Sequence, residues 1–172
     1  MIIDILKYLG SFILLVFLQV LILNNIQLSG YINPYLYILF IITLPIQLKK
    51  WAILVIAFVL GICIDMFCNT GGLHAAATLL IAFIREPLLD LFSPREGFNA
   101  SSKPDLNQLG IQSFLYYALV MTSIHHLFFF FLEEFSFSEF FRVIFRSILS
   151  VFFTMILIMI SQYIRFDKSE KS

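Results

Sequence analysis

The chain has 172 residues, of which 60% are hydrophobic and 13% are charged. Soluble domains carry about 25% charged residues, so this chain has too few polar side chains to cover a water-soluble globule of its size. A cytosolic enzyme is therefore excluded. The formal net charge is +0, which gives no cationic surface for nucleic acid, so we expect no DNA or RNA partner.

Hydropathy predicts six apolar stretches, each interpreted as a transmembrane helix. A helix rises about 1.5 Å per residue and the hydrocarbon core is about 30 Å thick, so about 20 residues are required and about 17 are tolerated. The expected fold class is all-α: a single integral membrane domain over residues 1–172, built as a bundle of six transmembrane helices. The predicted spans cover residues 5–23, 31–48, 51–68, 73–90, 110–132 and 139–163.

The first two stretches carry local signals of their own. The run that ends at Leu23 is followed by polar residues without a small-residue cleavage site, so we expect a retained helix rather than a signal peptide. In the second stretch, Asn33-Pro34 is typical of a helix start, and Pro45 is expected to kink the helix. Lys49 and Lys50 alone then precede the third stretch, which predicts a tight helical hairpin.

The distribution of basic residues predicts the orientation in the membrane. The hydrophilic segment 93–108 is predicted to be a cytoplasmic loop, and Lys and Arg accumulate in such loops. Six spans place nine basic residues inside and none in the outer turns, whereas five spans would put the 93–108 loop or the tail outside. We therefore predict six spans with both termini in the cytoplasm. The nine residues are Lys7, Lys49, Lys50, Arg85, Arg95, Lys103, Arg165, Lys168 and Lys171.

Charged residues at membrane depth are the first candidates for function, because each costs roughly 2.5–3.5 kcal/mol to insert. Asp65 and Arg142 lie at a similar depth in the outer half of the bilayer, and Arg146 lies one turn further along the face of Arg142. One interpretation is that Asp65 pairs with Arg142 or Arg146 and holds two helices together, with the rim glutamates hydrated. The other is that this cluster lines a cavity or docking surface open to the outside, where a ligand or partner binds.

Histidines form a second group of candidates. His74 opens the fourth span, and His125 and His126 lie in the outer third of the fifth. Neighbouring residues point about 100° apart on a helix, so this pair cannot bind one metal as an i, i+4 pair does. We predict that neighbouring groups satisfy these rings. No catalytic set or phosphate loop is recognisable, and Cys63 and Cys68 fit neither a disulfide scaffold nor a zinc site, so we expect no enzyme activity, metal or cofactor.

Glycines and one arginine carry structural predictions. Gly61 lies within the third span, where it predicts close approach of another helix, and Gly71-Gly72 predicts a tight outer turn. Arg85 lies at the inner end of the fourth span and is predicted to anchor that helix at the membrane interface.

The residues from the third span to the fourth carry a family resemblance. Gly61-Ile62-Cys63-Ile64-Asp65-Met66-Phe67, followed by Gly71-Gly72-Leu73-His74-Ala75 and the run to Arg85, resembles the rod shape-determining protein MreD family. That family has about this length, a Gly four residues before an Asp, and a Gly-Leu-His/Ala step that opens the next helix. Outside this segment the likeness rests on length and hydropathy, and the polar loop and the phenylalanine content depart from many members.

The resemblance implies a function and a set of partners. It implies a non-enzymatic scaffold in the bacterial cytoplasmic (inner) membrane, a component of the elongation complex that supports lateral cell-wall synthesis and cell shape. The implied partners are MreC-like and MreB-like proteins, alongside RodA-like and class B transpeptidase proteins. The resemblance also implies a fold similar to the substrate-binding subunits of energy-coupling-factor transporters, whose ligand pocket opens outward. The alternative function is therefore a small-molecule-binding membrane subunit of a transporter, for which Ala75, Ala76, Ala77 and Ala82 offer the small-residue patch that docks an ATPase module.

Overall fold

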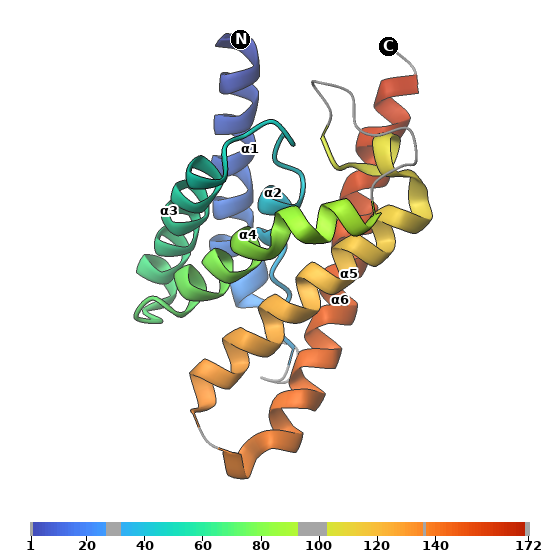
Figure 1. Cartoon of the computed structure of the whole chain (residues 1–172). Coiled ribbons are helices and arrows are strands. Elements are labelled where there is room, and N and C mark those ends of the chain that lie inside the picture. The colour runs from blue at the N-terminus through green and yellow to red at the C-terminus, as the bar shows by residue number, and fades with distance from the viewer. Residues whose placement is uncertain (1, 27–31, 93–102, 136, 171–172) are drawn as a thin grey trace.

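The computed structural model describes residues 2–26, 32–92, 103–135 and 137–170 (Figure 1). Within these residues the chain forms six α-helices and two short 3₁₀ helices, without a β-sheet, so the predicted all-α fold class is confirmed. The α-helices are α1 (Ile2–Leu21), α2 (Ile38–Ile42), α3 (Lys50–Cys68), α4 (Leu73–Phe92), α5 (Leu106–Glu134) and α6 (Phe140–Glu170), and the 3₁₀ helices are η1 (Leu23–Asn25) and η2 (Phe137–Glu139).

Four helical segments of the described chain are long and apolar enough to cross a membrane, and they make it a multi-pass membrane protein. α4 also has 20 residues, enough to cross a bilayer by length. It differs from the four segments in carrying three charged side chains close together in its apolar run, Arg85, Glu86 and Asp90. The four segments are Ile5–Asn25, Lys50–Cys68, Leu106–Glu134 and Phe140–Arg165.

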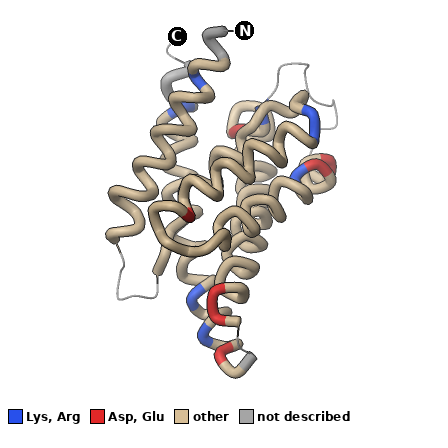
Figure 2. Tube along the Cα trace, turned by 90° about the vertical axis from the view of Figure 1, so that its left-hand side faces the viewer, with Lys and Arg blue, Asp and Glu red and all other residues tan. Residues whose placement is uncertain are grey.

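The long helices are arranged as two hairpins and a single helix. α3 packs along α4, α5 packs along α6, α4 packs against α5, and α1 lies against α3 (Figure 1). The beginning of α1 and the end of α6 lie at the same end of the molecule (Figure 1), where Arg165 Nη2 donates a hydrogen bond to Ser11 Oγ at 3.3 Å. Most charged residues gather toward the two ends of the bundle (Figure 2).

The second predicted span is not a transmembrane helix, and this prediction is wrong. Residues 32–49, which we call the central segment, contain only the five-residue helix α2. Pro34 and Pro45 explain the interruption. The residue before a proline is disfavoured in the helical conformation, and Pro45 ends a helix because its ring clashes with the carbonyl four residues earlier. Asn33 accordingly caps no helix, since α2 begins at Ile38 after Tyr37.

The central segment still crosses the molecule. It runs from the end of the bundle at which α1 finishes back to the end at which α3 begins (Figure 1). Every residue from Tyr35 to Leu44 is buried. Non-helical backbone at membrane depth is tolerated where protein surrounds it and satisfies its polar groups. The fold is thus built around an interrupted chain segment.

The structure can be compared with the sequence signals at the turn between α3 and α4 and at the start of α5. The tight turn predicted at Gly71-Gly72 is confirmed, with φ values of 59° and 97°, and Asn69 ends α3 at φ 56°. Asp105 caps α5, whose first turn is separated from the rest by a non-helical Gly110. Of the predicted loop 93–108, residues 93–102 lie outside the described residues.

Candidate functional site

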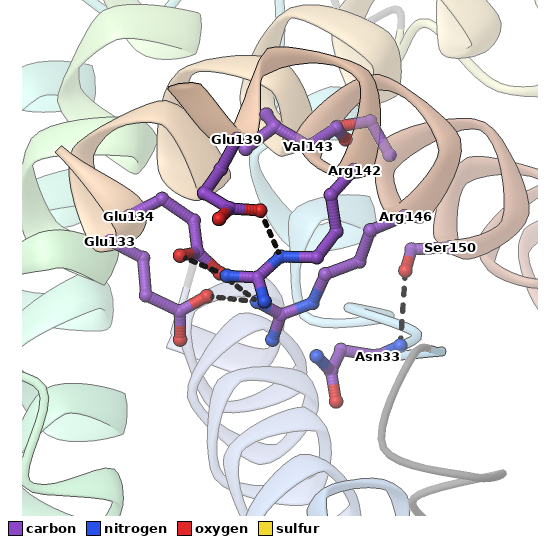
Figure 3. A network of polar contacts seen from close by, with 9 residues as sticks. Asn33, Glu133, Glu134, Glu139, Arg142, Val143, Arg146 and Ser150 are labelled. Atoms are coloured by element: carbon purple, nitrogen blue, oxygen red, sulfur yellow. Dashed lines mark hydrogen bonds and ion pairs between the residues drawn. The ribbon is translucent and has the colours of Figure 1, made fainter. Parts of the chain in front are cut away.

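Polar side chains from two helices, α1 and α6, bind the first half of the central segment. Ser150 Oγ on α6 accepts a hydrogen bond from the Asn33 amide at 3.0 Å, and Figure 3 shows this contact. One turn along α6, Thr154 Oγ1 accepts the Tyr35 amide at 3.0 Å. Gln19 of α1 donates to the Pro34 carbonyl at 3.0 Å. These contacts replace the intrahelical bonds that the interrupted backbone lacks.

Arg85 binds the second half of the central segment. Its Nε donates to the Ile41 carbonyl at 3.0 Å, and its Nη2 donates to the Leu44 carbonyl. Tyr117 of α5 also lies here, with its hydroxyl 3.4 Å from the Ile42 carbonyl. Arg85 is 2% exposed, so the prediction of an interfacial anchor is wrong. The Ile41 carbonyl also accepts the Leu44 amide at 3.4 Å, and the guanidinium adds a donor to it and to the Leu44 carbonyl where the helix ends.

A cluster of histidines and tyrosines surrounds the middle of the central segment. The Tyr37 hydroxyl lies 2.9 Å from His74 Nδ1 and 2.8 Å from His125 Nε2. A hydroxyl has one proton to donate, so it donates to one ring and accepts from the other. The Tyr35 ring packs between His74 and His126, with both centroid distances at 5.0 Å. These five residues, Tyr35, Tyr37, His74, His125 and His126, form the histidine–tyrosine cluster.

The rings of this cluster are closed off from solvent, and most of their polar atoms are engaged. His126 Nδ1 donates to the Thr122 carbonyl at 2.9 Å, and its Nε2 lies 3.2 Å from the Thr154 hydroxyl. The prediction that neighbours satisfy the histidines is confirmed for His126. In His125 the Nε2 atom is paired, but the Nδ1 atom has no hydrogen-bond partner among the described residues. All three histidines are at most 2% exposed, so they line no open outer cavity in this structure.

Asp65 binds the beginning of α4 rather than an arginine. Its Oδ1 accepts the His74 amide at 3.0 Å and the Thr70 hydroxyl at 2.5 Å, and its Oδ2 accepts the Ala75 amide at 2.9 Å. The predicted ion pair with Arg142 or Arg146 is therefore wrong. The first amides of a helix lack intrahelical acceptors, and the turn at Gly71-Gly72 folds those of α4 back onto the carboxylate.

Gly61 allows this contact between α3 and α4. A Cβ atom at Gly61 would lie 2.3 Å from Ala75 Cα and 2.6 Å from Ala75 N. The predicted close helix approach is therefore confirmed, and its partner is the first turn of α4. Gly61, Asp65, Gly71, Gly72 and His74 thus all belong to one corner, which joins α3 to α4 and places His74 against Tyr37.

Arg142 and Arg146 belong to a separate ionic network at the turn between α5 and α6. Figure 3 shows both guanidinium groups among the glutamates at the end of α5. Arg142 contacts Glu134 at 2.5 Å and Glu139 at 3.2 Å, and Arg146 contacts Glu133 at 2.5 Å. The Cζ atom of the Arg146 guanidinium also lies 4.3 Å from the Phe130 ring centroid. The rim glutamates are therefore ion-paired.

The sequence reading missed the polar residues that bind the central segment. They carried a signal, because Ser150 and Thr154 are spaced i, i+4 on one helical face within an apolar run, as helix-associating hydroxyls are in membranes. Tyr35 and Tyr37 flank the interruption that Pro34 marks. None of these side chains is ionisable near neutral pH, so the cost of inserting a charge into the membrane does not single them out.

No protein-family model, curated protein or solved structure matches this chain. Within the described residues there is also no group of three or more His, Cys, Asp or Glu side chains placed to hold a metal ion.

The geometry predicts that Asp65 and Arg142 act independently. Asp65→Asn turns an amide toward the Ala75 N–H and should lower the free energy of unfolding by about 1–2 kcal/mol. Arg142→Gln should cost less than about 1 kcal/mol, because the Arg142 side chain is 47% exposed. The double variant should show the sum to within about 0.5 kcal/mol, measured by reversible unfolding in detergent. Coupling well beyond that would contradict the assignment, and the Glu133→Gln and Arg146→Gln cycle is the positive control for coupling.

Proposed function

We propose that this protein is a non-enzymatic membrane scaffold of a bacterial elongation complex, as the resemblance to the MreD family implies. The observation that carries the proposal is the α3–α4 corner. The residues on which the resemblance rests, Gly61, Asp65, Gly71, Gly72 and His74, act together there to fix two helices. These residues hold two helices in a fixed arrangement. A scaffold needs such an arrangement, because its partners bind surfaces whose shape must stay constant.

The use of the buried polar groups also supports a scaffold. Ser150, Thr154 and Arg85 bind backbone atoms of the central segment, and the Asp65 carboxylate binds backbone amides of α4. These groups are committed to holding the fold, whereas a catalytic carboxylate or base must face a space that a substrate can enter.

In this proposal the chain crosses the cytoplasmic membrane six times, with the central segment as an interrupted second crossing and both termini in the cytoplasm. The arrangement of basic residues supports that orientation. The proposed likeness to energy-coupling-factor substrate-binding subunits rests on the resemblance to the MreD family. The proposed partners are MreC-like and MreB-like proteins, together with RodA-like and class B transpeptidase proteins.

A contact face for a partner's transmembrane helix is available on α6. Phe141, Phe145, Ile148 and Phe152 follow the i, i+4, i+7, i+11 spacing of one helix face, and they are 85%, 60%, 61% and 59% exposed. Large side chains on a helix face can pack against a second helix in lipid, where van der Waals contact drives association.

The test of the scaffold function is depletion and complementation in the bacterium of origin. Depletion should make elongated cells round and lower the recovery of the MreC-like protein with its partners. Wild-type protein should restore both, whereas the double variant Phe145→Ala, Phe152→Ala should accumulate normally yet lower MreC-like recovery several-fold. Leu14→Ala on α1, where Leu14 is 61% exposed, is the matched control. Normal morphology and an intact complex after depletion would rule the function out.

One observation favours the alternative, a small-molecule-binding subunit of a transporter. His125 Nδ1 and Thr122 Oγ1 are buried without hydrogen-bond partners among the described residues, and they lie one turn apart on α5. A bound polar ligand would supply the missing partners if the cluster opened. A thermal shift with a vitamin panel tests this function: a shift that His125→Phe abolishes would support it, and the absence of any shift would count against it.

A further inference from the structure

A basic pocket of about 320 Å³ lies at the end of the molecule where α1 begins and α6 ends. Lys7 of α1, Lys103 before α5 and Arg165 of α6 line it together with one carboxylate, Asp105. That carboxylate is oriented toward backbone, because its Oδ1 accepts the amides of Asn107 and Gln108 at 3.1 Å each. Three cations from three separate parts of the chain therefore converge on one space.

A buried amide in the same pocket lacks a partner. Gln162 of α6 lines the pocket and is 2% exposed. Its Nε2 atom has no hydrogen-bond acceptor among the described residues. A buried donor without an acceptor costs about 1–3 kcal/mol, and a ligand oxygen in the pocket would remove that cost. The buried Gln162 donor and the surrounding cations both favour an oxyanion as the ligand of this pocket.

An apolar groove adjoins the basic pocket. It encloses about 630 Å³ between α1, the central segment and α3, and its walls include Leu9, Phe12 and Val59. Tyr8 and Phe40 line both the groove and the pocket. A polar, positively charged space therefore continues into an apolar one that runs along lipid-exposed helices, and this combination matches an amphipathic ligand with an anionic end.

We propose that this end of the protein binds a phosphate-bearing anionic lipid, with its phosphate among Lys7, Lys103 and Arg165 and an acyl chain in the groove. Gln162 donates to a phosphate oxygen. Lys and Arg recognise phosphate through charge-assisted hydrogen bonds, and basic pockets between transmembrane helices bind anionic headgroups in this way. A soluble phosphate compound would share the headgroup chemistry and leave the groove unused. This inference stands apart from the proposed scaffold function.

The test uses the purified full chain in neutral detergent, with phosphatidylglycerol as the probe and phosphatidylcholine as the zwitterionic comparison. Native mass spectrometry and melting temperature report binding. We expect phosphatidylglycerol to be retained and to raise the melting temperature more than phosphatidylcholine. The double variant Lys103→Gln, Arg165→Gln should weaken phosphatidylglycerol binding by about tenfold or more. Lys49→Gln, Lys50→Gln removes the same charge from residues that line neither the pocket nor the groove and should retain binding.

Two further variants separate a lipid site from surface charge and from a soluble ligand. Gln162→Leu removes the unpartnered donor, so it should leave the lipid-free protein at least as stable while weakening phosphatidylglycerol binding. Val59→Trp obstructs the groove and should weaken lipid binding without affecting the charges. The proposal would be overturned if the Lys49, Lys50 control lost as much phosphatidylglycerol binding as the Lys103, Arg165 variant, or if the latter kept full binding. It would also be overturned if inorganic phosphate alone raised the melting temperature as much as phosphatidylglycerol.

Discussion

A single methyl group at Gly61 is expected to destabilise the protein strongly. In Gly61→Ala the new Cβ would lie 2.3 Å from Ala75 Cα and 2.6 Å from Ala75 N. Both are backbone atoms that cannot rotate away, so α3 and α4 must separate. The separation also weakens the hydrogen bonds from the His74 and Ala75 amides to Asp65. We expect the free energy of unfolding to fall by about 1–3 kcal/mol or more, measured as a lower melting temperature in detergent.

Gly10→Ala is the matched control for this substitution. Gly10 lies within α1, and a Cβ there would meet nothing within 4 Å. Alanine favours a helix over glycine by about 1 kcal/mol, so the melting temperature should stay the same or rise. If Gly61→Ala melted with the wild-type protein and Gly10→Ala, the close contact between α3 and α4 would be disproved.

The sequence predicts the long helices well because hydropathy and turn chemistry agree on where they end. Polar or glycine residues bound each apolar run, and the observed limits of α3 and α4 lie close to the predicted ones. The same measure fails for the central segment. Its residues from Tyr35 to Leu44 are as apolar as those of a spanning helix, because all of them are buried within the protein. Pro34 and Pro45 are the signals against a continuous helix, because together they interrupt it near both ends, whereas each alone is compatible with a helix start or a kink.

The candidate site was predicted as a set of residues but not as a set of contacts. Depth along a helix places Asp65 and Arg142 at one level, yet it does not fix the direction in which either side chain points. The Asp65 carboxylate accepts hydrogen bonds from the first amides of α4, which carry no formal charge and so do not appear in a count of opposite charges. Arg142 pairs instead with Glu134, across the turn between α5 and α6. His74 and His125 were singled out separately. Tyr37 brings them together, and its partners depend on the path of the interrupted segment.

The largest loss is expected for Arg85. Arg85→Leu removes the side-chain donors to the Ile41 and Leu44 carbonyls. The Ile41 carbonyl then keeps only backbone donors, such as the Leu44 amide at 3.4 Å, and the buried Leu44 carbonyl loses the donor that the guanidinium gave it. Because two hydrogen bonds from a charged donor are lost, each contributing about 1.5–3 kcal/mol, the free energy of unfolding should fall by roughly 3–5 kcal/mol. Hydrogen exchange measured by mass spectrometry should speed up over Ile38–Leu44, because the central segment loses its attachment to α4.

Two further substitutions make the Arg85 prediction specific. Arg85→Lys keeps the charge, but an ammonium lacks the planar fork that serves two carbonyls at once, so it should recover only part of the loss. Arg142→Gln removes an arginine whose side chain is 47% exposed and should leave exchange over Ile38–Leu44 unchanged. Because an apolar residue can replace a buried charge without loss when it packs well, wild-type stability in Arg85→Leu is the decisive contrary result. It would mean that packing alone holds the central segment, and that the hydrogen bonds from α4 add nothing to the fold.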